Sequence, residues 1–314
     1  MNSRPIVALA GGIGAARFLD GLTRVVPPAR VFVIGNTGDD TEQHGLHVSP
    51  DLDTVTYALA GMSDPVRGWG IKNESFRCLR ALGKFGSPTW FQLGDHDLAT
   101  HLFRTERLAD GASLGNVTAE IAAALGVRAK IVGMTNDRVR TRIVTRTGEL
   151  EFQTYFVKRR ARDKVLRVRF DGAAQAKPAP GLLRAIRDAQ AIIICPSNPF
   201  ISIGPILAIP GIRDALRARR ERVIAVSPIV GGRALKGPAA KMMKSMKLES
   251  SALGVAKLYR DFVSTFVVDR VDRIHAKEIE KLGMRAIVAN TIMTGLRERT
   301  ALARAVVRAA GIRA

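Results

Sequence analysis

Short apolar runs that end in glycine or polar residues alternate along the chain with segments of helical spacing. Residues 5–10 form such a run, and Gly11-Gly12-Ile13-Gly14 follows it. In residues 15–26 the apolar side chains recur at three- and four-residue intervals, as on one face of a helix. A second apolar run at residues 31–35 leads into Asn36-Thr37-Gly38-Asp39-Asp40. This order of strand, glycine loop, helix and strand predicts the beginning of a doubly wound parallel sheet.

The same patterns predict the remaining elements. Further strands are expected at residues 129–133, 141–145, 149–155, 165–170, 191–195, 222–227 and 284–289, with a hairpin turn at Arg146-Thr147-Gly148. Helices are expected at residues 53–62, 75–82, 99–108, 114–125, 181–189, 235–246, 252–259 and 296–310. We therefore expect an α/β fold with a Rossmann-like, mostly parallel sheet and helices on both faces. Residues 1–62 and 128–314 are expected to form this core, and residues 63–127 a mainly helical insertion or cap.

Composition excludes several classes of protein. The chain has 314 residues, of which 46% are hydrophobic, enough for a sizeable core, so a wholly disordered chain is excluded. No apolar run approaches the ~18–20 residues that a membrane span needs, and the pattern of the first residues is not the one expected of a signal peptide. Two cysteines, Cys78 and Cys195, cannot supply a disulfide framework or a zinc site alone. We expect a cytoplasmic protein that does not bind a membrane.

Charge points to an anionic partner. Lys and Arg number 49 and Asp and Glu 28, which gives a net charge of +21. Such an excess fits nucleic acid, a membrane surface or a phosphorylated substrate. The basic runs at residues 158–169 and 213–222 are interleaved with apolar residues, as on solvated faces, and no nucleic-acid-binding motif accompanies them. Aromatic residues make up only 5%, which argues against stacking on single strands, so we expect no nucleic acid partner.

The glycine loop after the first strand is a candidate phosphate site. Gly11, Gly12 and Gly14 would let a phosphate approach backbone amides at a helix N-terminus. The loop is not a Walker motif, because no Gly-Lys-Ser or Gly-Lys-Thr follows. Arg17 stands where a dinucleotide fingerprint has its third glycine, so NAD binding is not favoured. A tight turn without a ligand is the alternative.

Four aspartates gather against the positive trend of the chain. Asp39 and Asp40 follow the second strand, and Asp51 and Asp53 lie at the beginning of the next helix. Each alone fits a turn or a helix cap. Together they supply the hard oxygen ligands that Mg²⁺ takes from proteins, usually one or two carboxylates completed by substrate phosphates. We predict that Asp39, Asp40, Asp51 and Asp53 form a Mg²⁺ site.

Two later loops also follow predicted strands and carry ligand-binding groups. Pro196-Ser197-Asn198-Pro199 offers a hydroxyl and an amide at the carboxyl edge of the sheet. The loop at residues 227–239 combines glycines with Arg233 and Lys236, which suits a diphosphate, although a basic surface loop is the alternative. Residues 93–101 read LGDHDLATH, and their Asp and His side chains fit either a helix cap or metal and acid–base chemistry.

In this combination the chain resembles the 2-phospho-L-lactate transferase family (CofD, or FbiA in actinobacteria) of coenzyme F-420 biosynthesis. The resemblance is spread over most of the chain and keeps one order. The stretches that carry it are GGIGAARFLDGL (11–22), GNTGDD (35–40), SPDLDTVTYALAG (49–61), RGWGIKNESF (67–76), WFQLGDHDLATHL (90–102), CPSNPFISIGPIL (195–207) and AVSPIVGGRALKGPAAKMM (225–243).

The resemblance implies a Mg²⁺-dependent transferase that works as a homodimer. In that family, a guanosine diphosphate ester of a three-carbon acid passes its phosphoacid to the terminal ribityl hydroxyl of the deazaflavin Fo. GMP leaves, and the product is F-420 without its glutamate tail, or the dehydro form. The sequence does not identify the acid, which is phospholactate, phosphoenolpyruvate or 3-phosphoglycerate. A rival interpretation is a protein of the same fold that binds a nucleotide sugar and regulates metabolism without transferring anything.

The resemblance also assigns residues. Asp39 and Asp53 are expected to be catalytic, and Asp53→Ala to abolish turnover while the fold stays intact. Asp53 and Gln92 occupy positions that contact Fo, although relatives often have a basic residue in place of Gln92. Ile13 and Ala15 depart from the family's usual Gly-Gly-Thr-Gly-Gly loop. The residues expected to bind the donor are Gly11, Gly12, Gly14, Asn36, Ser197, Asn198, Ser227, Gly231, Gly232 and Lys236.

Overall fold

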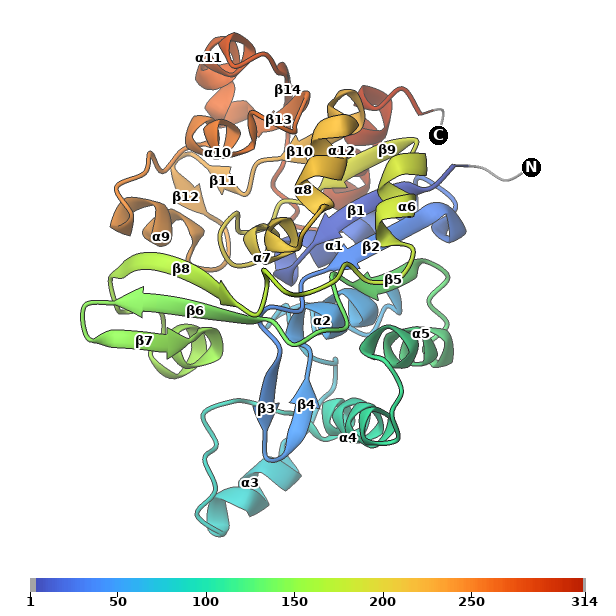
Figure 1. Cartoon of the computed structure of the whole chain (residues 1–314), viewed down its shortest axis with the longest axis vertical. Coiled ribbons are helices and arrows are strands. Elements are labelled where there is room, and N and C mark those ends of the chain that lie inside the picture. Colours follow the sequence, from blue (N-terminus) through green and yellow to red (C-terminus); the bar gives the residue numbers. More distant parts are fainter. Residues whose placement is uncertain (1–3, 313–314) are drawn as a thin grey trace.

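A single parallel sheet forms the centre of the molecule. The computed structural model describes residues 4–312, and its main sheet has the strand order β14-β13-β10-β9-β1-β2-β5 (Figure 1). From β1 the chain adds β2 and β5 on one side, then returns to place β9, β10, β13 and β14 on the other. The strands are β1 (Ile6–Ala10), β2 (Val31–Gly35), β5 (Lys130–Gly133), β9 (Ala191–Ile194), β10 (Val223–Val226), β13 (Thr265–Asp269) and β14 (Arg285–Ala289). The predicted Rossmann-like parallel sheet is confirmed, with its topological switch point between β1 and β9.

Helices cover both faces of this sheet. Because successive side chains of a strand point to opposite faces, Val7 and Leu9 of β1 enter one core, and Ile6 and Ala8 enter the other. The second core is closed by α1 (Gly12–Leu22), α2 (Pro50–Leu59), α5 (Leu114–Ala124) and α12 (Leu296–Ala309). The first is closed by α6 (Leu182–Asp188), α7 (Ile203–Ala208), α8 (Ile212–Ala218), α9 (Ala239–Ser245), α10 (Ala252–Tyr259) and α11 (Ala276–Lys281).

A separate antiparallel sheet stands beside the carboxyl edge of the main one (Figure 1). It consists of β6 (Arg140–Thr145), β7 (Gly148–Glu151) and β8 (Val165–Asp171) in the order β7-β6-β8. The predicted hairpin is confirmed, but the expected strand over residues 149–155 ends at Glu151, and a π-helical turn follows at Thr154–Lys158. Phe152 and Tyr155 both enter one small core. Side chains three residues apart reach the same side from a helical turn but not from a strand.

The segment expected to form an insertion contains three helices. The hairpin β3 (Thr41–Gln43)–β4 (Leu46–Val48) projects from the main sheet together with α3 (Arg77–Lys84) and α4 (Asp95–Ala109), as Figure 1 shows. By contrast, α5 packs on β5 and contributes to the main core. Helix α4 begins four residues earlier than predicted. The Glu74 carboxylate accepts hydrogen bonds from the backbone N–H groups of His96 (2.9 Å) and Asp97 (3.1 Å) and so caps its first turn.

Several other boundaries differ from the prediction. Strand β13 and helices α7, α8 and α11 were not predicted, and α8, which buries Ile212 and Leu216, overlaps the basic run at residues 213–222. Helix α1 already begins at Gly12, and α9 only at Ala239, after a small hairpin of β11 (Ile229–Val230) and β12 (Arg233–Ala234). Within residues 4–312, no helix has the length and apolar character that a membrane crossing requires.

Candidate active site

A cleft opens at the carboxyl ends of the central strands, around the switch point. Its cavity has a volume of about 310 Å³. Loops that follow β1, β2, β9, β10 and β14 all contribute to its walls, and this is where open α/β sheets bind ligands. Lining residues that the sequence had singled out are Gly11, Gly12, Gly14, Asp39, Asp51, Ser197, Asn198, Ser227 and Lys236.

Two loops meet closely at the floor of the cleft. The Gly11 N–H donates to the Ser197 hydroxyl at 3.4 Å, across the switch point. A Cβ on Gly14 would lie 2.2 Å from the carbonyl oxygen of Pro196, and Gly12 has a φ of +71°. Glycine is therefore required at both positions, by space at one and by backbone conformation at the other. Since α1 begins at Gly12, its N-terminal amides and positive dipole end face the cavity.

Asp51 connects three elements at this floor. Its Oδ1 accepts from the Gly12 N–H at 2.8 Å, and its Oδ2 accepts from the Asn36 amide at 2.9 Å. Asn36 also donates to the carbonyl oxygen of Ile201 at 3.0 Å. The carboxylate thereby joins α2, the glycine loop and the end of β2. Burial raises the pKa of Asp51 to about 6, against an ordinary value of 3.8, and the two hydrogen bonds offset part of that rise.

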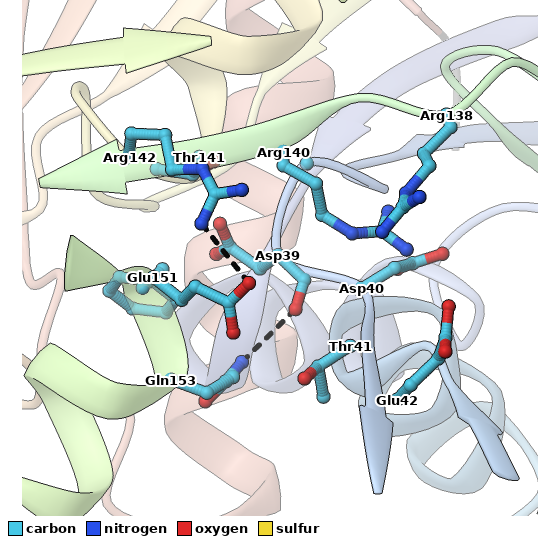
Figure 2. Close-up of a pocket in the computed structure, with 12 residues that line it drawn as sticks. Asp39, Asp40, Thr41, Glu42, Arg138, Arg140, Thr141, Arg142, Glu151 and Gln153 are labelled. Carbon is cyan, nitrogen blue, oxygen red and sulfur yellow. Dashed lines mark hydrogen bonds and ion pairs between the residues drawn. The ribbon is translucent and has the colours of Figure 1, made fainter. Parts of the chain in front are cut away.

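Asp39 and Asp40 lie next to Asp51 and are also buried. Asp39 lines the cleft and also a second, smaller cavity of about 150 Å³ (Figure 2). Its pKa is raised well above the ordinary value, first by burial and then by the charge of Asp51. Asp40 accepts from the Ser49 hydroxyl at 2.8 Å, and His47 Nε2 lies 3.1 Å from the same oxygen. Within the described part of the chain, the Oδ1 atoms of Asp39 and Asp40 have no hydrogen-bond partner.

These carboxylates fit a divalent cation that substrate phosphates complete. Burial and neighbouring carboxylates raise the pKa of Asp39 and Asp51, and Oδ1 of Asp39 and of Asp40 has no hydrogen-bond partner in the described part of the chain, so these carboxylates are only partly neutralised. Three arginines, Arg138, Arg140 and Arg142, line the smaller cavity with Asp39 and Asp40 (Figure 2). Mg²⁺ is commonly held by only one or two carboxylates plus phosphate and water. In residues 4–312, no group of three or more His, Cys, Asp and Glu side chains is arranged to hold a metal by itself. Asp39 and Asp51 are the carboxylates that face the cleft.

Asp53 lies apart from this cluster. Two residues on from Asp51, it projects from another side of α2 and lines neither cavity. The Arg104 guanidinium donates to both of its oxygens, at 3.1 Å for Oδ2 and closer for Oδ1, and Arg104 is only 1% exposed. Burial raises the pKa of Asp53, and the Arg104 charge is the largest opposing effect. The structure thus brings Asp39, Asp40 and Asp51 together but separates Asp53 from them.

A buried network continues outward from Arg104. The His101 Nδ1 lies 3.1 Å from Arg104 Nη1, and the His101 Nε2 lies 3.3 Å from Asp97 Oδ1. The Tyr57 hydroxyl donates to Asp97 at 2.7 Å, which returns the network to α2. Sequence reasoning did not identify Arg104. The signal was present, because Asp97, His101 and Arg104 recur at helical spacing and form a polar stripe on one face of α4.

Four other predicted residues lie outside the cavity walls, namely Asn36, Gly231, Gly232 and Gln92. The Gly231 N–H donates to the Asp272 carboxylate at 3.0 Å, and Gly232 follows it. Gln92 is exposed and donates to the Thr89 carbonyl oxygen at 2.9 Å. Conversely, the cavity has lining residues that the sequence did not suggest, namely Phe152, Phe156 and Thr291–Thr294. Phe152 lies in the strand that was expected over residues 149–155, and Phe156 directly after it, so the helical turn that brings both rings to the cavity was not predicted.

Comparisons with known proteins converge on one family. The family model described as 2-phospho-L-lactate transferase CofD matches residues 6–305. A phosphoenolpyruvate transferase from Streptomyces griseus is 44% identical over 305 residues, covering 95% of this chain and 96% of the relative. A 2-phospho-L-lactate transferase from Methanosarcina mazei is 38% identical over 304 residues, which cover 97% of this chain and 100% of the relative. A crystal structure of a UPF0052 family protein from Bacillus halodurans shares the fold, with a TM-score of 0.59 and 19% identity. The match covers 92% of this chain and 93% of that protein.

Proposed function

Because the chain belongs to the 2-phospho-L-lactate transferase CofD family, we propose that it transfers a phosphorylated three-carbon acid from a guanosine diphosphate ester to the deazaflavin Fo, releasing GMP. The chain is a transferase of this family. The donor, the acceptor and the requirement for Mg²⁺ are our proposal. The observation that carries the proposal is the cleft at the switch point, where the glycine loop, the loops after β9 and β10 and buried carboxylates face one cavity.

The diphosphate of the donor lies at the glycine loop in this proposal. The amides at the N-terminus of α1 and the Ser197 hydroxyl are hydrogen-bond donors for phosphate oxygens. Ser227 also lines the cavity, but its hydroxyl donates to the Ile229 carbonyl oxygen at 2.8 Å. Lys236 adds a positive charge on the other side of the cavity. These groups bind and orient the donor, and they neutralise the charge that moves onto the leaving GMP.

The reaction forms a bond between the terminal hydroxyl oxygen of Fo and the phosphorus of the phosphoacid. The bond between that phosphorus and the bridging oxygen of GMP breaks, and the hydroxyl proton passes to a cleft carboxylate. Asp39 and Asp51 are the candidates for this proton and for holding Mg²⁺, which when bound would neutralise phosphate charge. Arg104 neutralises Asp53, so in this proposal Asp53 fixes α2 and through it the position of Asp51.

Mass spectrometry of the reaction mixture tests the proposal. Fo and Mg²⁺ are incubated with the guanosine diphosphate esters of phospholactate, phosphoenolpyruvate and 3-phosphoglycerate, first singly and then in competition. We expect one deazaflavin phosphodiester to dominate, with GMP released in equal amount. Reactions without Mg²⁺ are the control for the metal. If none of the three donors yields a phosphodiester, the proposal fails.

We also propose that the chain works as a homodimer in the cytoplasm, as the family resemblance implies. Sedimentation of the purified chain measures the first point, with a mass near twice 34.0 kDa as the expected result. A mass of one chain at assay concentration would contradict it.

A further inference from the structure

Beside the cleft carboxylates lies a pair of stacked phenylalanine rings. Phe152 and Phe156 have ring centroids 5.4 Å apart and planes inclined by only 9°. Both line the cleft cavity together with Asp39 and Asp51. Phe152 is anchored in the small core beneath the antiparallel sheet and is 7% exposed, whereas Phe156 is 37% exposed. One ring is therefore fixed by packing, and it supports a second ring that is open to the cavity.

The turn that carries these rings is tied to the loop that carries Asp39. The Gln153 side-chain amide donates to the backbone carbonyl oxygen of Asp39 at 3.2 Å, as Figure 2 shows. Phe152 and Phe156 are four residues apart and fall on one side of the helical turn that includes Thr154–Lys158. π-Helical turns are rare and often occur at functional sites. The position of the Phe156 ring is thus fixed relative to the reacting carboxylates.

Different groups line different parts of the cleft. The phosphate-binding loops follow β1 and β9 at the centre, and Lys236 and Thr291–Thr294 lie toward the β10 and β14 side. Asp39 follows β2, and the turn that carries the two phenylalanines is tied to its loop by the Gln153 hydrogen bond. Phe152 also packs with Ile201 and Met242, which follow β9 and β10. In an in-line displacement, the attacking and leaving oxygens lie on opposite sides of phosphorus. With Asp39 as the carboxylate that takes the proton, the attacking hydroxyl enters beside Asp39, and the nucleoside extends to the other side.

From this arrangement, and resting on the proposed function, we infer that Phe156 is the stacking surface for the aromatic ring system of the acceptor. The half-exposed Phe156 ring offers a flat apolar face for stacking, whereas the helix N-terminus and Lys236 in the same cavity suit phosphate. Stacked aromatic pairs contribute about 0.5–1.5 kcal/mol beyond their buried area, which corresponds to about two- to twelvefold in affinity. Phe152 supports the ring from behind, and the pair orients Fo so that its ribityl chain reaches Asp39.

Fluorescence titration of Fo into the purified protein tests this assignment. Phe156→Leu keeps an apolar side chain but loses the ring, and we expect it to raise the Kd for Fo about three- to tenfold. Phe156→Tyr keeps the ring and is expected to keep the affinity. GDP should bind both variants as it binds wild type. Phe103→Leu on α4 is the matched control, since Phe103 is 40% exposed but does not line the cavity.

Each outcome decides the assignment. An unchanged Kd for Fo in Phe156→Leu, with wild type forming product, overturns the stacking surface and leaves the proposed function standing. A loss of GDP affinity with Fo binding unchanged also overturns it, because the ring would then hold the nucleobase. Wild type that forms no phosphodiester with any donor defeats the proposed function, and the assignment with it.

Discussion

Asp51 and Asp53 are two residues apart on the same helix, yet their surroundings differ in kind. Asp51 is held by uncharged donors, Gly12 N–H and the Asn36 amide, beside two further carboxylates. Asp53 is held by a buried guanidinium, that of Arg104. Burial raises the pKa of both. At Asp53 the charge of Arg104 offsets part of this rise in pKa. At Asp51 the rise is offset only by uncharged hydrogen-bond donors.

The comparison separates ligand chemistry from fold chemistry. The carboxylates of the cleft are not fully neutralised by protein groups, and a bound cation can supply the missing positive charge. The network of Asp53 and Arg104 is neutral as an ion pair, and it joins α2 to α4 inside the protein. We therefore expect substitutions in the cleft to act on turnover, and substitutions in the network to act on stability.

The largest effect is expected when Asp53 is replaced by alanine. This removes the carboxylate that is hydrogen-bonded to the buried Arg104 guanidinium, and breaking a buried ion pair in this way typically costs about 3–5 kcal/mol of folding free energy. Urea unfolding measures the loss. The double variant Asp53→Leu with Arg104→Met is the control, and it should recover much of the loss because neither charge remains. The sequence alone predicted an intact fold for Asp53→Ala; wild-type stability combined with lost turnover would favour that earlier interpretation.

Replacing Asp39 by asparagine is expected to lower turnover and to leave stability intact. We expect turnover to fall about 10²–10³-fold, the size typical of losing one charged or polar group that acts on the transition state. Stability should be kept or should rise in metal-free protein, because a buried carboxylate without a hydrogen-bond partner is removed. Product formation and urea unfolding are measured on the same preparation. Unchanged turnover in Asp39→Asn would remove Asp39 from the reaction.

The smallest expected effect is the pH dependence of the free energy of unfolding in metal-free protein. Since the folded-state pKa of Asp51 is about 6 and the ordinary value is 3.8, the folded state holds this proton more tightly than the unfolded state. The resulting stability is fully present below about pH 4 and is lost as pH rises through 6, with a difference of about 3 kcal/mol. The free energy of unfolding in a chelator, taken relative to Asp51→Asn from pH 4 to 7, measures it. A flat difference would show that Asp51 titrates as an exposed carboxyl does.

Much of the fold was predictable from local pattern. Strands such as Val31–Gly35 are continuous apolar runs that end in glycine, and the loops after them supply most of the cleft. Strand β13 was missed because the residues between it and α10, 260–264, contain no glycine or proline to mark a turn, and α8 because its buried Ile212 and Leu216 are surrounded by arginines.

The details of the site depended on contacts between distant residues. Asp53 and Arg104 are 51 residues apart, so the sequence grouped Asp53 with its near neighbours Asp39 and Asp51. Phe156 entered the cleft only because the chain leaves β7 in a helical turn rather than continuing as a strand. Periodicity locates elements, but it does not determine which side chains of two elements meet.

Binding of Mn²⁺ as a spectroscopic substitute for Mg²⁺ tests the contrast between the two aspartates most directly. Electron paramagnetic resonance counts free Mn²⁺ in the presence of GDP, with wild type, Asp51→Asn and Asp53→Asn measured side by side. We predict that Asp51→Asn loses most of the bound Mn²⁺ and that Asp53→Asn, where folded, binds as wild type does. Loss of Mn²⁺ from folded Asp53→Asn with full binding to Asp51→Asn would contradict the assignment of the two carboxylates.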